Sequence, residues 1–293
     1  YVNPILSQTS DADADLVKLI FCGLYSYDTQ GKLQPELAES LDVSEDGKIY
    51  TVHLKQGSFF HDGNEVTADD VAFTVQAIQS PANKSPLRQN WQAVEVRVAD
   101  RYTVIFELKK AYFGFPENLT VGILPKHIWS DIGADKFLLA DYNLSPIGCG
   151  PYRYEDAVKD SNGNILEYRV VAFEKYAGGA PYIAKITLRF YPDEAALIDA
   201  YLRKEVMGMQ GVSSEGALRL TDRKSANIRQ IATPRSFAVF FNQTTSAALA
   251  FDEVRQALNQ GTDRQAIVSE VLGGRGTEAM GPFLPFMEEY ATD

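Results

Sequence analysis

The side chains that could perform acid–base chemistry are few, and their spacing does not bring them together. The chain has three histidines in 293 residues, which are His53, His61 and His127. Asp69 and Asp70 form an adjacent carboxylate pair, but successive residues of a helix point about 100° apart and are poorly placed to share a proton. His61 and Asp62 are neighbours in a predicted turn. None of these groups forms a convincing catalytic site.

No motif with a defined catalytic spacing occurs. The sequence lacks the Gly-x-Ser-x-Gly elbow, the His-Glu-x-x-His helix and the Cys-x-x-Cys pair. A glycine-rich stretch at residues 273–276 follows a predicted helix, whereas a phosphate-binding loop would precede one. We therefore predict no catalytic residue, no metal ligand and no cofactor, and an exported hydrolase is a disfavoured alternative.

The predicted strands and helix that would position these groups have their clearest sequence signals between residues 38 and 78. Apolar residues alternate at Leu41 and Val43 and again over residues 50–54. The Ser-Glu-Asp-Gly stretch between the two runs supplies turn polarity and a glycine, which predicts a hairpin.

A capped helix is predicted directly after this hairpin. Thr67 precedes Asp70 by three residues, a close variant of the capping box, so the helix should begin at Ala68. Asp69 and Asp70 suit the positive end of the helix dipole, which explains them better than catalysis does. Apolar residues at i, i+4 and i+7 give the helix one buried face, formed by Val71, Val75 and Ile78.

The rest of the chain has turn signals and periodicities of a mixed α/β protein. We predict a helix over residues 11–24, a second hairpin of residues 94–98 and 104–108, and strands at 168–173, 186–190 and 237–241. A further helix should open at Pro192-Asp193, and Asp252 and Asp263 should cap two more helices, the last one ending at Gly273 and Gly274.

Composition restricts the class of partner. The net charge is -11, from 28 basic and 39 acidic residues, and no basic cluster is present to contact phosphates. This disfavours nucleic acid as a partner. The hydrophobic fraction of 45% allows sizeable cores, yet no apolar run approaches the ~20 residues that span a bilayer. We expect a chain of about two domains that does not span a membrane.

Several short motifs, in their order along the chain, resemble the bacterial extracellular solute-binding proteins of family 5. These proteins serve ABC importers and bind oligopeptides, dipeptides or nickel chelates. The motifs are residues 3–7 (NPILS), 35–40 (PELAES), 46–47 (DG), 62–63 (DG), 67–71 (TADDV), 124–127 (LPKH), 148–152 (GCGPY), 241–242 (FN), 254–258 (VRQAL) and 263–264 (DR).

The resemblance implies a fold and a domain organisation. The fold is the periplasmic-binding-protein-like class II (cluster C) α/β fold, with mixed sheets and flanking helices. Residues 1–37 and 143–237 would form a discontinuous domain I, residues 38–142 an inserted domain II, and residues 238–293 the beginning of domain III. Family members continue well beyond this point, so we expect the chain to be C-terminally truncated and its third domain to be incomplete.

The resemblance also implies candidate binding residues. In the family, the segment after the Asn-Pro motif lines the ligand cleft, and here it has four hydrogen-bonding side chains: Ser7, Gln8, Thr9 and Ser10. The alternative is that Ser10 only caps the following helix. Phe237 could line the cleft near the hinge, although an aromatic residue in a strand usually belongs to the core. Gly148 and Gly150 resemble a hinge-proximal loop, for which a purely structural turn is the alternative.

The two cysteines, Cys22 and Cys149, permit at most one disulfide. Export would allow them to pair. The residues themselves favour two separate buried thiols, and the disulfide stays open as the alternative.

The implied function is that of an extracytoplasmic receptor of an ABC importer. Two lobes would close about a hinge on a peptide or similar small solute, and the closed form would deliver it to the permease subunits. The protein would lie in the periplasm or at the cell surface, with a signal peptide or lipoprotein anchor inferred, because the chain begins at Tyr1. A solute-sensing receptor or regulator not coupled to import is the alternative. Any homodimer of this fragment is expected to be an artefact of exposed third-domain faces.

Overall fold

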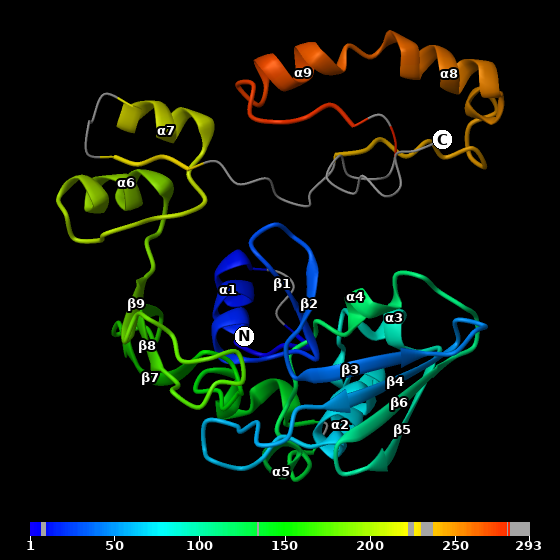
Figure 1. Cartoon of the computed structure of the whole chain (residues 1–293). Helices are drawn as coiled ribbons and strands as arrows, with labels where there is room; N and C mark the ends of the chain where they lie inside the picture. The colour runs from blue at the N-terminus through cyan, green and yellow to red at the C-terminus, as the bar shows by residue number, and fades with distance from the viewer. Residues whose placement is uncertain (7–9, 134, 222–225, 230–236, 280, 282–293) are drawn as a thin grey trace. The chain divides into compact units, whose positions relative to one another are not determined.

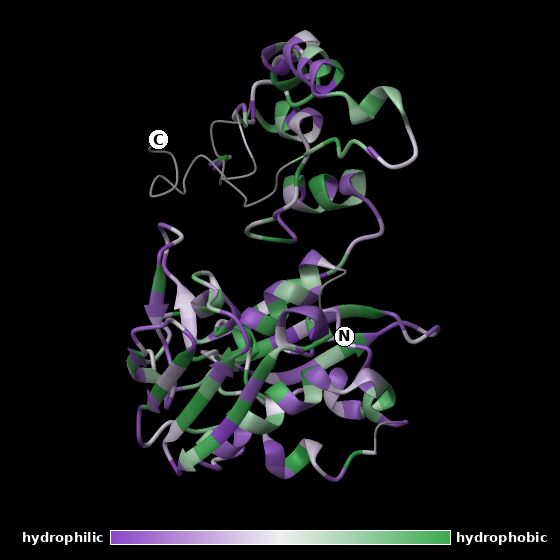
Figure 2. Ribbon diagram, turned by 90° about the vertical axis from the view of Figure 1, so that its right-hand side faces the viewer, coloured by the Kyte–Doolittle hydropathy of each residue, from purple (hydrophilic) through white to green (hydrophobic). Residues whose placement is uncertain are grey.

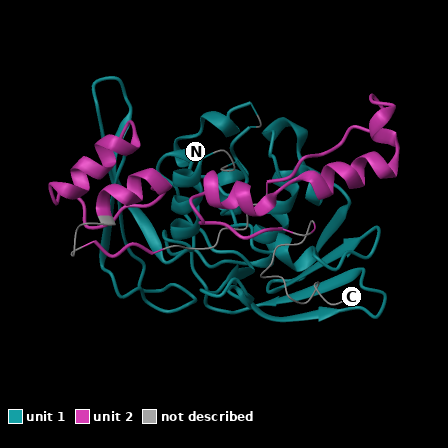
Figure 3. Ribbon diagram, turned by 90° about the horizontal axis from the view of Figure 1, so that it is seen from above, with its two compact units in different colours: residues 1–190 teal, residues 191–293 magenta. Residues whose placement is uncertain are grey.

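The computed structural model describes residues 1–6, 10–133, 135–221, 226–229, 237–279 and 281 (Figure 1). The chain divides into two compact units, residues 1–190 and residues 191–293, shown in different colours in Figure 3. Each unit is described by itself below. The finer domain boundaries implied by the family resemblance stay a prediction.

The first unit contains three antiparallel sheets and five helices among its described residues. The strands are β1 (Tyr25–Tyr27), β2 (Leu33–Pro35), β3 (Ala38–Val43), β4 (Ile49–Leu54), β5 (Val94–Asp100), β6 (Thr103–Leu108), β7 (Tyr152–Lys159), β8 (Ile165–Ala172) and β9 (Lys185–Arg189). The helices are α1 (Asp11–Ile20), α2 (Ala68–Gln79), α3 (Arg88–Trp91), α4 (Phe115–Asn118) and α5 (Lys126–Trp129).

The largest sheet has the strand order β3-β4-β6-β5, and every neighbouring pair is antiparallel. Both predicted hairpins are confirmed here, as β3–β4 and β5–β6. Leu41 lies opposite Val52 and Val43 opposite Tyr50 in the first hairpin. Hydrophobic and hydrophilic residues alternate along these strands (Figure 2). The period-2 pattern places one face toward the core because successive strand side chains point to opposite faces.

Helix α2 packs against strands β5 and β6 of this sheet (Figure 1). It begins at Ala68 as predicted, and its apolar face of Val71, Val75 and Ile78 is fully buried. A cluster of aromatic rings from the sheet and from the segments beside it fills part of the same core. Ring centroids are 4.8 Å apart between Tyr50 and Phe115, 5.8 Å between Trp91 and Phe115, and 5.7 Å between Phe106 and Phe115.

Asp70 stabilises both the start of α2 and the start of α5. Its Oδ2 accepts hydrogen bonds from the backbone N–H and the hydroxyl of Thr67, each 2.9 Å long, and its Oδ1 accepts one from the Lys126 backbone N–H at 2.9 Å. The carboxylate is 5% exposed. Asp69 is exposed and pairs with the Lys126 ammonium at 2.8 Å. Both aspartates therefore have structural roles.

Helix α1 ends four residues earlier than predicted. The apolar spacing suggested a helix to Leu24, but α1 ends at Ile20 and Phe21 is extended. The backbone that follows bonds to other segments instead: the C=O of Cys22 accepts from the Ile123 N–H at 2.9 Å, and the C=O of Gly23 from the Leu37 N–H at 3.2 Å. These long-range backbone hydrogen bonds replace the helical ones.

A three-stranded sheet of order β7-β8-β9 completes the main part of the first unit, and β1 pairs with β2 in a small hairpin. Strands β8 and β9 correspond to the predicted strands 168–173 and 186–190, displaced by a few residues. Tyr168 is fully buried, and its hydroxyl donates to the Leu144 carbonyl at 2.9 Å.

The second unit contains α6 (Glu194–Leu202), α7 (Ser214–Thr221), α8 (Asp252–Gly261) and α9 (Arg264–Glu270) in its described part. Asp193 and Asp263 cap α6 and α9 as predicted, each accepting a backbone N–H at 2.8 Å. Two predictions are wrong. Asp252 is the first residue within α8, and its cap position is Phe251. Residues 237–241 form no strand, because no described segment pairs with their backbone.

Candidate functional site

The N-terminal segment that leads to the predicted binding residues is held by a buried pair of asparagines. The Asn3 amide donates to the Asn143 Oδ1 at 2.9 Å, and the Asn143 amide donates to the Phe137 carbonyl at 2.9 Å. The Asn3 Oδ1 accepts the Ile5 N–H, and the Ile5 carbonyl accepts the Ser85 hydroxyl at 2.7 Å. This network fixes the path of the chain up to residue 6.

The predicted binding residues follow immediately. Ser7, Gln8 and Thr9 lie outside the described residues. Ser10 is exposed and forms the N-cap of α1, where its Oγ accepts the Asp13 N–H at 3.4 Å. The capping role that the sequence left open is therefore present, and the hydroxyl hydrogen still has the capacity to donate.

The C-terminal end of α1 contacts the loop that contains Gly148 and Gly150. The Gly150 N–H donates to the Ile20 carbonyl at 2.8 Å. A Cβ atom on Gly148 would lie 2.1 Å from the Ile20 carbonyl oxygen, and one on Gly150 would lie 2.7 Å from the Ile20 carbonyl carbon. Both positions require glycine because a side chain would overlap the α1 backbone.

A disulfide covalently links the loop that contains these glycines to the segment that follows α1. Cys22 and Cys149 are both buried and are bonded to each other, with their Cα atoms 5.3 Å apart. The residues alone favoured two separate thiols, and the structure joins them instead. Their 127-residue separation is closed only because the tertiary fold brings the loop onto the segment after α1.

The His61 ring bonds to the same loop at the residues directly before and after Cys149. Its Nδ1 accepts the Gly148 N–H at 3.2 Å, and its Nε2 lies 3.1 Å from the Gly150 carbonyl oxygen. These partners require the neutral tautomer with the proton on Nε2. The His61 backbone N–H also donates to the Gly148 carbonyl at 2.8 Å, and the ring meets Phe173 edge-on at 4.9 Å.

Electrostatics keeps His61 neutral. Burial lowers the pKa of its imidazole from 6.5 to about 4, and the Arg153 charge acts in the same direction, whereas the Gly150 carbonyl and Asp62 raise it. A proton on Nδ1 would remove the acceptor for the Gly148 N–H. His61 is therefore a structural hydrogen-bonding residue of the loop rather than a general base.

Glu36 is a buried carboxylate that sequence reasoning missed. It is 9% exposed, its Oε2 accepts the Gly23 N–H at 2.8 Å, and its Oε1 accepts the Tyr176 hydroxyl at 2.5 Å. The Lys55 ammonium donates to the Glu36 backbone carbonyl at 2.7 Å. Burial raises the pKa of the Glu36 carboxyl, opposed by its hydrogen bonds with Tyr176 and Gly23. An acidic residue directly before an apolar Leu-Ala pair was the available signal.

Each of the other two histidines lies beside a carboxylate. His127 bonds the Asp62 carboxylate at 2.7 Å. His53, on the second strand of the large sheet, lies 3.3 Å from the Asp42 carboxylate and 3.2 Å from the Thr103 hydroxyl. Among the described residues no group of three or more histidines, cysteines or carboxylates could hold a metal ion. No helix in that part of the chain is long and apolar enough to cross a membrane.

The predicted aromatic residue lies in the second unit, away from any core. The Phe237 side chain is 90% exposed and that of Phe240 is 93% exposed. This exposure does not fit the predicted strand at 237–241, whose aromatic side chains were expected to belong to the core. Asn242 bonds locally: its Oδ1 accepts the Thr244 N–H at 3.1 Å.

Comparison with known proteins places this arrangement in a family. The profile of the bacterial extracellular solute-binding proteins, family 5 Middle, matches residues 32–293. The chain is 31% identical to the oligopeptide-binding protein AppA of Bacillus subtilis over 297 aligned residues, covering 98% of this chain and 52% of that protein. It is 29% identical to the dipeptide-binding protein of Escherichia coli, covering 88% of this chain and 51% of that protein. The chain thus spans about half the length of these relatives.

Solved structures agree in fold. AppA of Bacillus subtilis in complex with a nonapeptide superposes with a TM-score of 0.74 at 27% identity, covering 99% of this chain and 57% of that one. NikZ from Campylobacter jejuni in complex with Ni(L-His) gives a TM-score of 0.74 at 26% identity, covering 96% and 55%. The predicted periplasmic-binding-protein fold is confirmed by these likenesses, and the chain belongs to the bacterial extracellular solute-binding proteins of family 5.

Proposed function

We propose that this chain is part of an extracytoplasmic solute-binding receptor of an ABC importer. The receptor captures a peptide or similar small solute by closure of two lobes and delivers it to a membrane permease. The family match over residues 32–293 is the observation that carries this proposal. Binding and closure are thermodynamically linked in such a receptor, because the solute stabilises the closed form by contacting both lobes.

Peptide is the solute class that the relatives favour. Their names include oligopeptide-binding, dipeptide-binding and glutathione-binding proteins. The same set contains a heme-binding protein and a structure with a nickel–histidine complex, so the fold accepts other solutes as well. The relatives are named as binding proteins, and we therefore assign this chain a binding role.

An oxidising compartment fits the covalent structure. The buried disulfide between Cys22 and Cys149 is stable outside the cytoplasm, where thiols are not kept reduced. Together with the family description, this supports a periplasmic or cell-surface location. A signal peptide or lipid anchor belongs to the proposal as the means of export.

We assign solute contacts to Ser7, Gln8, Thr9 and Ser10 and, near the hinge, to Phe237. Ser10 supports this assignment because it is exposed at the start of α1, with hydrogen-bonding capacity beyond its cap. Gly148 and Gly150 are assigned to the base of the hinge. Domains I (1–37 and 143–237), II (38–142) and III (from 238) are proposed as the domain organisation.

Mass spectrometry of solute released on denaturing the protein purified from its host tests the function. Release of peptides, absent from a mock purification, is the expected result. Reproducible release of a different solute would overturn the peptide assignment and keep the receptor. Conversion of an added peptide by the purified protein would overturn the binding role itself.

Two variants at Ser10 separate solute binding from helix capping. Ser10→Asp keeps an N-cap acceptor for α1 and removes the hydroxyl donor, while Ser10→Ala removes both. Ser10→Asp should lower peptide affinity measured by calorimetry without lowering thermal stability. Unchanged affinity in Ser10→Asp would limit the residue to its capping role.

A further inference from the structure

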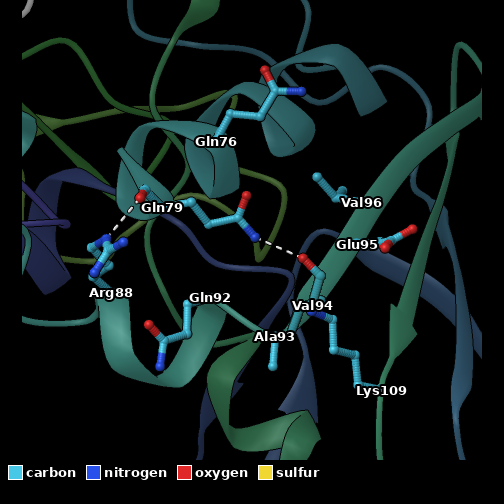
Figure 4. Close-up of a pocket in the computed structure, with 9 residues that line it drawn as sticks. All are labelled: Gln76, Gln79, Arg88, Gln92, Ala93, Val94, Glu95, Val96 and Lys109. Atoms are coloured by element: carbon cyan, nitrogen blue, oxygen red, sulfur yellow. Dashed lines mark hydrogen bonds between the residues drawn. The ribbon is translucent and has the colours of Figure 1, made fainter. Parts of the chain in front are cut away.

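Strand β5 is the outermost strand at one end of the large sheet, and its outer edge is accessible (Figure 1). Among the described residues it pairs with β6 alone. A cavity of about 460 Å³ lies beside the beginning of the strand, between residues 93–96 and side chains of α2 and α3 (Figure 4). This cavity separates the helices from the strand edge, so a further strand has room to approach. An exposed edge of this kind is a template for pairing with another chain.

The hydrogen bonds of the sheet show which backbone groups of β5 point outward. The N–H of Lys109, directly after β6, donates to the Ala93 carbonyl at 3.4 Å, so Ala93 directs its backbone groups toward β6. In an antiparallel pair every second residue does so. The intervening residues, Val94, Val96 and Val98, therefore direct their N–H and C=O groups away from β6, to the outer edge.

The side chain of Gln79 supports this direction. Its amide donates to the Val94 carbonyl at 2.7 Å from the outer side of the strand (Figure 4). No hydrogen bond links the N–H or C=O group of Val96 to another described residue. Val96 thus offers one donor and one acceptor, the two groups that a strand residue exchanges with a single residue of an antiparallel neighbour.

The sequence of β5 is complementary to itself around Val96. When two copies of the strand run antiparallel with Val96 opposite Val96, Glu95 of each copy lies opposite Arg97 of the other. Val94 then lies opposite Val98. Successive strand residues point to opposite faces, so the charges share one face and the valines share the other. Figure 4 agrees, because the Glu95 carboxylate points away from the cavity.

Within one copy, these charges have no partner of opposite sign among the described residues. Neither Glu95 nor Arg97 forms an ion pair there. Glu95 lies directly opposite Glu107 on β6, and like charges in this arrangement destabilise a sheet. Arg97 of a second copy would lie on the other side of Glu95 and offset this repulsion. Val98, which is 39% exposed, would cover the edge beside Val94 of that copy.

We propose that two copies of this chain associate through β5, with Val96 on the twofold axis. The two four-stranded sheets then form one continuous sheet, and every contact occurs twice, as in any interface with twofold symmetry. Each Val96 exchanges two backbone hydrogen bonds with the other, flanked by two Glu95–Arg97 pairs. This interface lies in the first unit, unlike the third-domain faces that were expected to cause an artefactual dimer. It is independent of the transport function.

The opposite edge of the sheet lacks this complementarity. Strand β3 contains two acidic residues and no basic one, so two copies of it would bring no opposite charges together. Its ladder is also interrupted by a bulge between Ala38 and Ser40. The choice of β5 over β3 therefore follows from charge and regularity.

Sedimentation velocity of the 293-residue chain over a range of concentrations tests the association. A reversible dimer is expected. Val96→Pro removes the outward N–H without removing a hydrogen bond to β6, so this variant should be monomeric. Val43→Pro on β3 is the matched control and should dimerise like the unmodified chain. The Ser44 N–H donates to the Ile49 carbonyl at 2.9 Å, which directs the Val43 N–H outward by the same alternation.

Two charge variants test the register. Arg97→Glu turns both attractive pairs into repulsive ones and should weaken the dimer about tenfold or more. Combining Glu95→Arg with Arg97→Glu restores opposite charges in both pairs and should restore the dimer. Recovery in the double variant separates charge pairing from damage to the fold, and thermal melting of every variant checks folding directly.

A cysteine on the twofold axis tests the register by covalent trapping. Directly opposed residues have Cα atoms about 5.5 Å apart, which a disulfide spans. Val96→Cys should therefore form a disulfide-linked dimer under mild oxidation. Val98→Cys should not, because the two Val98 positions lie four residues apart in this register, about 13 Å. Both natural cysteines are already bonded to each other, so neither competes.

Three results would overturn the proposal. The first is a chain that stays monomeric at high micromolar concentration. The second is a dimer that persists in Val96→Pro and is lost in Phe240→Ser, because Phe240 is exposed in the second unit and the interface would then lie there. The third is a double charge variant that dimerises no better than Arg97→Glu, which would exclude the Glu95–Arg97 pairing.

Discussion

Replacing His61 by glutamine should remove a defined part of the acid sensitivity of folding. The imidazole joins Gly148 and Gly150 through its two nitrogen atoms, and this requires the neutral ring. A glutamine side chain has both a donor and an acceptor but does not titrate. His61→Gln therefore separates the hydrogen bonds of this side chain from its proton equilibrium.

The sign and size of the effect follow from the pKa. The folded protein lowers the pKa of His61 to about 4 from 6.5, so the unfolded chain binds the proton more tightly between these values. The contribution of His61 to stability is then complete above about pH 6.5 and is lost as pH falls toward about 4. At about 1.4 kcal/mol per pH unit, the interval corresponds to about 3 kcal/mol. Partial exposure of the ring reduces the expected loss to about 2 kcal/mol.

Urea unfolding at about pH 7 and about pH 4.5 measures this difference. The unmodified protein should lose about 2 kcal/mol more than His61→Gln on acidification, since other groups titrate alike in both. His53→Gln is the control, because His53 lies half-exposed beside Asp42 on the large sheet. It should retain the acid sensitivity of the unmodified protein. Equal losses in the unmodified protein and in His61→Gln would refute the reasoning.

Three further substitutions test contacts that the tertiary structure assigns. Replacing Cys22 and Cys149 together by alanine should lower the free energy of unfolding by about 4 kcal/mol, because the disulfide closes a loop with a separation of 127 residues. Asp70→Ala should cost about 2 kcal/mol or more in urea unfolding, because it removes the acceptor of Thr67 and of a distant backbone N–H. Gly148→Ala should lower the melting temperature sharply, since its Cβ would lie 2.1 Å from a carbonyl oxygen.

Each of these three predictions has a control or a result that would contradict it. Two free thiols per chain, titrated under denaturing conditions without reductant, would contradict the disulfide. Asp69→Ala removes only an exposed ion pair and should cost at most about 1 kcal/mol, so equal losses at Asp69 and Asp70 would contradict the capping role. Gly208→Ala introduces a Cβ with no neighbour within 4 Å and should leave the melting temperature almost unchanged.

The candidate site was predictable only in part. The Asn-Pro motif predicted binding residues at 7–10, and the Gly-Cys-Gly motif predicted a hinge-proximal loop at 148–150. The sequence had no means of showing that His61 bridges Gly148 and Gly150, because the partners are 87 and 89 residues apart. Glu36 and Tyr176 are separated by 140 residues, and nothing local to either residue identifies the other as its partner.

The sequence by itself determined the local elements and the family. Alternating apolar residues specified the β3–β4 and β5–β6 hairpins, and Thr67 with Asp70 specified the start of α2, because these signals act over a few residues. The early end of α1 and the Cys22–Cys149 disulfide were decided by the tertiary structure. In each case the contacts join segments that are distant along the chain. The secondary-structure propensity of one segment does not indicate which distant segment it will contact.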